Sequence, residues 1–313
     1  MSMAFVFPGQ GSQEVGMGKA LADAFPAARE VFQEVDEALG QNLSKLMFEG
    51  PDDELRLTEN AQPALMAVSM AVMRILEAEG GFSLADKAAF VAGHSLGEYS
   101  ALAAAGAFAL ADTARLLKTR GQAMQQAVPV GKGAMAALLG LELDDARAVA
   151  AAAADGEICT VANDNSPGQV VVSGHTAAVE RAVDIAKDRG ARRAVMLPVS
   201  APFHCPLMAP AADVMAEALG RTAIDAPVPV LVANVTAESV ADPDTIRRLL
   251  VEQVTGAVRW RESVLYMKNE GVDRLVEAGA GKVLSGLARR IDRDLAGSAI
   301  NAPDDVEEFL KTV

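Results

Sequence analysis

The chain has 313 residues, of which 51% are apolar, and it carries a formal net charge of −14. This length and composition allow one large domain, or two modest ones, with a substantial core. The acidic balance argues against a nucleic-acid partner, because phosphate binding requires a basic surface.

Three features of the sequence argue against a disulfide-rich or metal-binding protein, a secreted protein and a membrane-spanning protein. The two cysteines, Cys159 and Cys205, form no Cys/His cluster, so we expect no disulfide framework, no metal and no other cofactor. The N-terminal apolar run has no basic residue and is broken by Pro8, which is unlike a signal peptide. The longest apolar stretch, residues 101–111, is too short to cross a bilayer. We therefore expect a cytoplasmic protein without membrane contact.

The first part of the chain alternates strands and helices. Residues 3–7 are typical of a buried strand and lead into a glycine-rich loop at residues 9–13. We expect Pro63 to occupy the first position of an apolar helix over 63–76. The pattern then predicts a strand at 90–92 and helices at 96–105 and 110–126.

The middle of the chain has a different, shorter repeat of elements. We predict strands at 134–141, 158–162, 169–173 and 194–198, helices at 144–154 and 177–188, and a turn at 163–168. This order, βαββαβ, is the ferredoxin-like unit. The sequence therefore predicts an α/β fold in which residues 128–198 form a small subdomain. That subdomain is inserted into a large one made of residues 1–127 and 199–313, with later strands at 228–233 and 275–278.

Residues 93–97, Gly-His-Ser-Leu-Gly, follow a short apolar run and precede a helical pattern. This is G-x-S-x-G in a strand–turn–helix context, where a sharp turn exposes the serine hydroxyl. The two glycines have no Cβ to clash with neighbouring backbone. The helix start offers N–H groups and a positive dipole end to an oxyanion. We predict that Ser95 is a nucleophile.

A serine nucleophile needs a proton acceptor, usually histidine, and the chain has three. His94 is next to Ser95 in the turn, where neighbouring side chains diverge, so we expect it to pack and to bond locally. His175 lies between a predicted strand and helix, where solvation of the helix start is the simpler role. His204 stands between Pro202 and Pro206, which restrict the loop. By elimination, His204 is the predicted base.

The third member of a triad is not selected by spacing. Asp213, Asp225 and Asp242 all follow His204, and none stands out as its partner. Cys205 is a poor candidate nucleophile, because adjacent residues in an extended segment point apart. A serine–histidine pair by itself is compatible with an esterase or thioesterase as well as with an acyltransferase.

Six short motifs occur in order along the chain. They are Phe7-Pro8-Gly9-Gln10-Gly11-Ser12-Gln13, Gln62-Pro63-Ala64-Leu65, Gly93-His94-Ser95-Leu96-Gly97-Glu98-Tyr99, Arg120-Gly121, Asn165-Ser166-Pro167-Gly168-Gln169 and Glu277-Ala278-Gly279-Ala280-Gly281-Lys282-Val283-Leu284. On these motifs the chain resembles the malonyl-CoA:acyl-carrier-protein transacylases of bacterial fatty-acid synthesis over essentially its full length. The resemblance implies an α/β-hydrolase-like large subdomain with a ferredoxin-like insert.

The resemblance also implies a reaction and roles for individual residues. Ser95 takes the malonyl group from malonyl-CoA as an ester with His204 as base, and the phosphopantetheine thiol of acyl carrier protein then attacks that ester. The oxyanion donors fall on the backbone N–H groups of Gln10 and Leu96. Gln253, rather than a carboxylate, orients the histidine.

Two further positions bear on substrate choice. Arg120 corresponds to the family's carboxylate clamp, and a guanidinium fork holds the carboxylate that distinguishes malonyl from acetyl. Phe203 stands where many free-standing family members have a small residue such as serine. In the similar polyketide acyltransferases, phenylalanine there accompanies malonyl over methylmalonyl, so we expect malonyl preference here.

An acidic chain should repel an acidic carrier protein at long range, so docking requires a local basic patch. The candidates are Lys187, Arg189, Arg192, Arg193, Arg289 and Arg290. We expect a monomer that meets its carrier transiently. Three alternatives remain at this point: a serine esterase or thioesterase, a malonyl transferase of a malonate decarboxylase complex, and an inactive scaffold. Arg120 argues against the esterase, since a simple esterase has no use for a carboxylate clamp.

Overall fold

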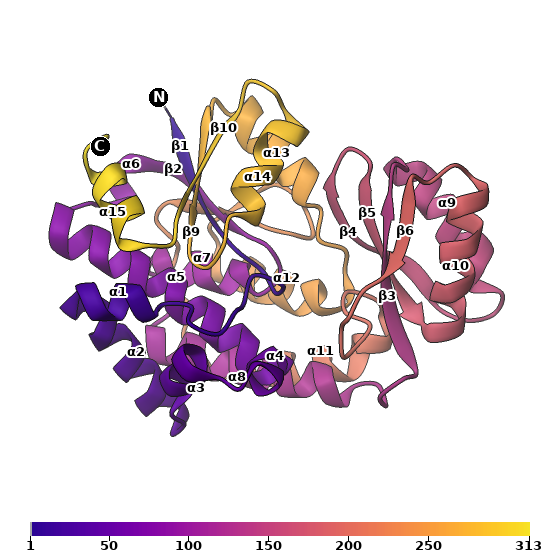
Figure 1. Cartoon of the computed structure of the whole chain (residues 1–313), viewed down its shortest axis with the longest axis horizontal. Helices are drawn as coiled ribbons and strands as arrows, with labels where there is room; N and C mark the ends of the chain where they lie inside the picture. The colour runs from indigo at the N-terminus through magenta and orange to yellow at the C-terminus, as the bar shows by residue number, and fades with distance from the viewer. Residues whose placement is uncertain (1) are drawn as a thin grey trace.

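Two separate sheets organise the chain (Figure 1). The structure is a computed structural model that describes residues 2–313. In the larger sheet, of order β10-β9-β1-β2-β7-β8, only β8 is antiparallel to its neighbour. Its strands are β1 (Met3–Phe7), β2 (Ala88–Gly93), β7 (Val230–Val232), β8 (Ser239–Val240), β9 (Arg274–Ala278) and β10 (Ala296–Ile300).

Helices cover both faces of the larger sheet, as a parallel sheet requires. Side chains of β1 alternate between the two faces: Phe5 and Phe7 enter the core of the N-terminal helices, while Ala4 and Val6 pack with Trp260 on the other face. The helices of this part are α1 (Lys19–Ala24), α2 (Pro26–Leu39), α3 (Leu43–Glu49), α4 (Asp52–Arg56), α5 (Thr58–Gly80), α6 (Leu84–Lys87), α7 (Gly97–Ala104), α8 (Leu110–Gln126), α11 (Ala209–Gly220), α12 (Pro243–Thr255), α13 (Trp260–Asn269), α14 (Val283–Ile291) and α15 (Pro303–Leu310), with a short 3₁₀ turn at Pro206–Met208.

The smaller sheet is antiparallel, with the order β4-β5-β3-β6, and α9 and α10 cover one of its faces, at the right of Figure 1. Its elements are β3 (Gly133–Leu139), α9 (Leu143–Ala154), β4 (Cys159–Ser166), β5 (Gln169–His175), α10 (Thr176–Asp188) and β6 (Arg193–Met196). This is the ferredoxin-like order that the sequence predicts, and the mixed α/β fold is confirmed. All six elements lie within residues 128–198, although the subdomain boundaries themselves stay a prediction.

A short backbone bridge joins the two parts of the chain. The Val258 N–H donates to the carbonyl of Ala162 at 2.8 Å, and the Asp164 N–H donates to the carbonyl of Val258 at 3.0 Å. The buried Asp164 carboxylate also pairs with Arg261 at 2.9 Å. These contacts fix β4 against the segment that leads from α12 to α13.

The predicted start of the apolar helix at Pro63 is wrong. Helix α5 begins at Thr58, so Pro63 lies inside it. The first turn is held by packing rather than by local signals, because α8 approaches it closely. A Cβ on Gly121 would lie 2.5 Å from the Glu59 Cα. Tertiary packing therefore extends the helix past a residue that usually marks its first turn.

The predicted turn at residues 163–168 is also wrong in its length. Strand β4 continues to Ser166, and only residues 167–168 form the turn. Asn163, Asp164 and Asn165 are turn-forming residue types, but here they lie in a strand with two register shifts. Their contacts with Val258, Arg261 and His94 explain why polar residues stand there.

The sequence pattern does not predict two strands of the larger sheet, β8 and β10. Both lie at sheet edges. β8 has only two residues, and β10 consists mainly of small residues, so neither shows a clear strand pattern. Of the helices in residues 2–313, none has the length and apolar character needed to cross a membrane.

Candidate active site

Ser95 stands in a strained turn between β2 and α7. Its φ of 55° lies in the left-handed region, which is unusual for a residue other than glycine. The flanking glycines leave no room for a side chain: a Cβ on Gly93 would lie 1.9 Å from the Gly97 carbonyl carbon, and one on Gly97 would lie 2.2 Å from the Phe7 oxygen. The sharp turn predicted from the glycine spacing is therefore present, and the Ser95 side chain faces a cavity.

His204 is the histidine that reaches Ser95. Its Nε2 lies 2.8 Å from the Ser95 Oγ, and its φ of 57° is also in the left-handed region. On the other side of the ring, Nδ1 lies 2.9 Å from the carbonyl oxygen of Gln253 and 3.1 Å from that of Gly256. A carbonyl can only accept, so Nδ1 carries the proton and Nε2 is left to accept from the serine hydroxyl.

The surroundings of His204 keep its ring neutral. Burial, and next the positive charge of Arg120, lower the pKa of His204 to about 3 from its ordinary 6.5. Within residues 2–313 no carboxylate is hydrogen-bonded to this ring. None of the candidates Asp213, Asp225 and Asp242 is its partner.

Gln253 contacts three of the residues singled out from the sequence. Its backbone carbonyl accepts from His204, and its side-chain Nε2 donates to the Ser95 carbonyl at 2.9 Å. Its side-chain Oε1 accepts from Arg120 Nη2 at 2.8 Å. The contact with the histidine is made by the main chain, so the side chain of Gln253 is free for other contacts.

Arg120 is 1% exposed and points at the serine from helix α8. Its Nη2 lies 3.1 Å from the Ser95 Oγ, and its Nη1 donates to Gln62 Oε1 at 2.7 Å. The Nε of Arg120 is buried and has no partner among the described residues. Burial lowers the pKa of this guanidinium, and the Tyr99 ring lies 5.7 Å from it. A buried cation whose Nη2 lies beside the serine hydroxyl is suited to an acyl group that carries a carboxylate.

The cavity in front of Ser95 has a volume of about 440 Å³ and lies between the two parts of the chain. Gln10 and Leu96 belong to its wall next to the serine, and Phe203 adds an apolar face that is 8% exposed. The smaller sheet contributes polar side chains, and α14 contributes apolar ones. These are Asn163, Asn165 and Gln169 on one side and Val283, Leu284 and Leu287 on the other.

The remaining histidines and Cys205 lie outside the serine–histidine pair. His94 Nε2 is 2.9 Å from Asn165 Oδ1, so His94 bonds to the small sheet rather than locally. His175 accepts the Ile158 N–H at 2.9 Å through Nδ1 and is not among the residues that line the cavity. Cys205 is buried and donates to the Pro202 carbonyl at 3.1 Å.

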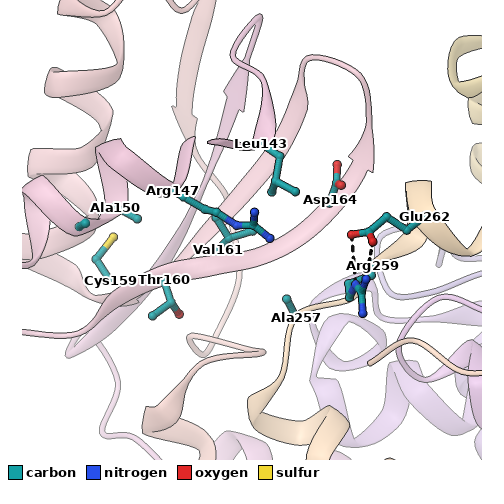
Figure 2. Close-up of a pocket in the computed structure, with 11 residues that line it drawn as sticks. Leu143, Arg147, Ala150, Cys159, Thr160, Val161, Asp164, Ala257, Arg259 and Glu262 are labelled. Atoms are coloured by element: carbon teal, nitrogen blue, oxygen red, sulfur yellow. Dashed lines mark hydrogen bonds and ion pairs between the residues drawn. The ribbon is translucent and has the colours of Figure 1, made fainter. Parts of the chain in front are cut away.

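A second cavity of about 370 Å³ lies where α9 and β4 meet the segment after α12 (Figure 2). Figure 2 shows the Arg147 side chain extending across it and Arg259 paired with Glu262. Its wall includes Cys159 but no histidine, and burial raises the pKa of the Cys159 thiol to about 11, so this cavity has no general base beside an activated nucleophile.

Comparison with known proteins agrees with the geometry. A family model described as acyl transferase domain matches residues 4–290. The malonyl CoA-acyl carrier protein transacylase of Escherichia coli (strain K12) is 49% identical over 310 residues, which cover 98% of each chain. This chain belongs to the malonyl CoA-acyl carrier protein transacylase family. Two solved structures are similar to this chain along its whole length.

The first is an acyl-carrier-protein-S-malonyltransferase from Bartonella henselae, with 55% identity and a TM-score of 0.97, covering 100% of this chain and 99% of that one. The second is a malonyl-transacylase in complex with a type II PKS acyl-carrier protein, with 42% identity, a TM-score of 0.97 and 100% of both chains covered.

Sequence reasoning missed two buried polar residues of this transacylase. Asn234 accepts the Ser95 N–H at 2.8 Å and donates to the Gly93 carbonyl at 2.7 Å, so it holds both sides of the turn. Glu98, 1% exposed, accepts from Gln253 Nε2 at 2.8 Å. A signal existed for each: Glu98 is a lone charge in an apolar helix, and Asn234 follows the end of a parallel strand.

Proposed function

We propose that this protein transfers a malonyl group from malonyl-CoA to the phosphopantetheine thiol of acyl carrier protein through a malonyl ester of Ser95. The observation that supports this most directly is the buried Arg120 guanidinium, whose Nη2 lies 3.1 Å from the Ser95 Oγ. A cation at that place compensates the malonyl carboxylate and offers nothing to a neutral acyl group.

In the first half-reaction, His204 Nε2 takes the Ser95 hydroxyl proton while Oγ bonds to the thioester carbonyl carbon. The carbon–sulfur bond then breaks, and His204 returns the proton to the departing coenzyme A thiolate. In the second half-reaction, the carrier thiol gives its proton to His204 and attacks the ester. Ser95 Oγ leaves and regains that proton, so the enzyme ends unchanged.

The oxyanion formed in each half-reaction needs donors already in place. We assign this role to the backbone N–H groups of Gln10 and Leu96, both in the cavity wall beside Ser95. Removing one such donor typically raises a barrier by about 3–4 kcal/mol. Because these donors belong to the backbone, a side-chain substitution at Gln10 acts only by displacing its N–H.

We further propose that the carrier docks on two exposed arginine pairs, Arg192–Arg193 and Arg289–Arg290. Arg193 begins β6, just before the Leu197–Val199 part of the cavity wall. The second pair lies in the last turn of α14, the helix that also supplies Leu287 to that wall. None of these arginines forms an ion pair within residues 2–313, whereas Lys187 pairs with Asp184 at 3.0 Å. The proposal includes a cytoplasmic monomer, in keeping with two buried, unpaired cysteines.

One measurement tests the proposed malonyl transfer through Ser95. The protein is incubated with malonyl-CoA, with and without phosphopantetheinylated carrier protein, and the acyl groups on both proteins are followed by intact mass. We expect a malonyl adduct on the wild-type enzyme, none on Ser95→Ala, and transfer of the adduct to the carrier. Adduct loss to water without transfer would favour the esterase, and labelling of Ser95→Ala would remove Ser95 from the mechanism.

A further inference from the structure

Glu98 is a buried carboxylate behind the active site. It stands in the first turn of α7, three residues after Ser95, and is not part of the cavity wall. Its Oε2 accepts from Gln253 Nε2 at 2.8 Å and from the Asn234 backbone N–H at 3.2 Å. Burial raises the pKa of Glu98 to about 7, against the effect of these two donors and of Arg120. A buried carboxyl group carries a desolvation penalty that an apolar side chain would avoid, so packing alone does not explain Glu98 at this position.

The Gln253 amide connects Glu98 to Arg120. Nε2 faces the carboxylate, and Oε1 accepts from Arg120 Nη2 at 2.8 Å. A carboxylate only accepts and a guanidinium only donates, so the two charged groups fix which end of the amide faces each of them. Gln253 and Arg120 are at most 1% exposed, so water does not compete for these bonds.

The same connection ends at the reacting serine. Arg120 Nη2 lies 3.1 Å from the Ser95 Oγ, and Gln253 Nε2 also donates to the Ser95 carbonyl at 2.9 Å. Arg120 is a long side chain, and apart from Ser95 its guanidinium is hydrogen-bonded only to Gln62 and Gln253 among residues 2–313. Loss of the Gln253 contact would therefore remove one of the two other hydrogen bonds that hold the guanidinium beside the serine.

We propose that Glu98 is a positioning residue that, through the Gln253 side-chain amide, fixes Arg120 at the place where the malonyl carboxylate must lie. This inference rests on the proposed malonyl transfer. It concerns the contact made by Glu98 rather than its charge. It predicts that loss of the contact reduces malonyl transfer more than acetyl transfer, because an acetyl group has no carboxylate to be placed.

Two substitutions separate contact from charge. Glu98→Asp keeps the charge but withdraws the carboxylate by one methylene, beyond hydrogen-bond reach of Gln253. Glu98→Gln removes the charge but can still present an oxygen to both donors. We measure kcat/KM for acylation of Ser95 by malonyl-CoA and by acetyl-CoA. The malonyl-to-acetyl ratio should fall at least about tenfold in Glu98→Asp, because a misplacement of about 1 Å in a reacting group can lower a rate by up to about 100-fold. The ratio should stay near that of the wild type in Glu98→Gln.

A matched variant distinguishes positioning from a general loss of structure. Glu277→Asp shortens another buried carboxylate, which accepts the Ser285 N–H at 2.8 Å and has no hydrogen bond with Gln253 or Arg120, so it should leave the ratio unchanged. In a Gln253→Met background, Glu98→Asp should have no further effect on the ratio, because the connecting amide is gone.

An unchanged ratio in a folded Glu98→Asp variant would overturn the inference, as would an equal change in Glu98→Gln. If Glu98→Asp does not fold, Glu98→Met, which removes both acceptor oxygens at similar volume, should show the same fall in ratio. A wild-type enzyme that forms no malonyl adduct contradicts the proposed function itself. If the wild-type enzyme forms the malonyl adduct and the Glu98 variants keep the wild-type malonyl-to-acetyl ratio, only the role of Glu98 is contradicted.

Discussion

The Nδ1 of His204 lies 2.9 Å from the backbone carbonyl oxygen of Gln253, where a serine–histidine–aspartate triad has a carboxylate. The carbonyl fixes the tautomer and the direction of the ring as a carboxylate does. It has no net charge, however, and so gives less stabilisation to an imidazolium ion. The nearby positive charge of Arg120 acts in the opposite direction. His204, the proposed base, is therefore well placed but weakly basic.

This weak base predicts an unusual pH profile. The pKa of His204 is lowered from 6.5 to about 3, so the neutral form persists as the pH falls through 6.5. The rate of Ser95 acylation should therefore stay constant as the pH falls through 6.5. It should decline only at a much lower pH, where His204 becomes protonated. Acetyl-CoA is the suitable donor, because Arg120 and Glu98 act on the malonyl carboxylate. Rapid-quench measurement of acyl-enzyme formation tests this. A decline of the acylation rate centred near pH 6.5 would mean that the pKa of His204 is not lowered.

The malonyl group itself should shift the same limb upward. Its carboxylate compensates the charge of Arg120, which is the second cause of the low pKa of His204. The acidic limb of kcat with malonyl-CoA should therefore lie at higher pH than the limb of kcat/KM, since the first reports the complex and the second the free enzyme. Coincident limbs would mean that Arg120 has no electrostatic effect on the base.

Arg120→Ala should lower malonyl transfer much more than acetyl transfer. A close charge pair in a buried site is worth about 2–5 kcal/mol, and acetyl forms no such pair. Arg115→Ala is the matched control, because Arg115 is an exposed arginine of the same helix and pairs with Asp112 at 3.1 Å. Steady-state kcat/KM for both donors measures the effect, and equal losses on the two donors would contradict the clamp.

The sequence predicts those parts of the site that depend on local chain geometry. Ser95 was found from its flanking glycines, and His204 by elimination among three histidines. Arg120 and Gln253 were assigned only through the family resemblance, because spacing does not show that α8 and α12 bring them to Ser95. Glu98 and Asn234 were missed since their partners lie up to 155 residues away in the chain.

Misleading local signals explain the two errors in the predicted elements. The residues at 163–165 favour a turn by composition, yet their side chains and backbone bond to His94, Val258 and Arg261, and this keeps them in a strand. Pro63 suggests a helix start, but packing of Gly121 against Glu59 extends the helix to Thr58. In both places a long-range contact overrides a local preference.

Phe203→Ser should increase tolerance of methylmalonyl-CoA. The ring is 8% exposed and lies in the cavity wall next to His204, where it would crowd an α-methyl branch. The ratio of kcat/KM for methylmalonyl-CoA to that for malonyl-CoA should rise. Phe82→Ser is a control for the lost aromatic volume, since Phe82 is buried against Phe5 and Phe309 outside this cavity. A ratio that does not move in Phe203→Ser would contradict crowding as the source of selectivity.

Charge reversal tests where the carrier protein docks. A net charge of −14 repels an acidic carrier at long range, so a local basic surface must overcome that repulsion. Arg192→Glu/Arg193→Glu and Arg289→Glu/Arg290→Glu should each raise the KM for the carrier about tenfold at low salt, as expected for steering by charge, and less at high salt. Arg74→Glu/Arg221→Glu makes the same change in net charge at two arginines outside the cavity wall, which pair with Glu77 and Glu217. It should raise this KM much less. If neither Arg192→Glu/Arg193→Glu nor Arg289→Glu/Arg290→Glu raises the KM for the carrier more than this control does, the carrier does not dock on these arginine pairs.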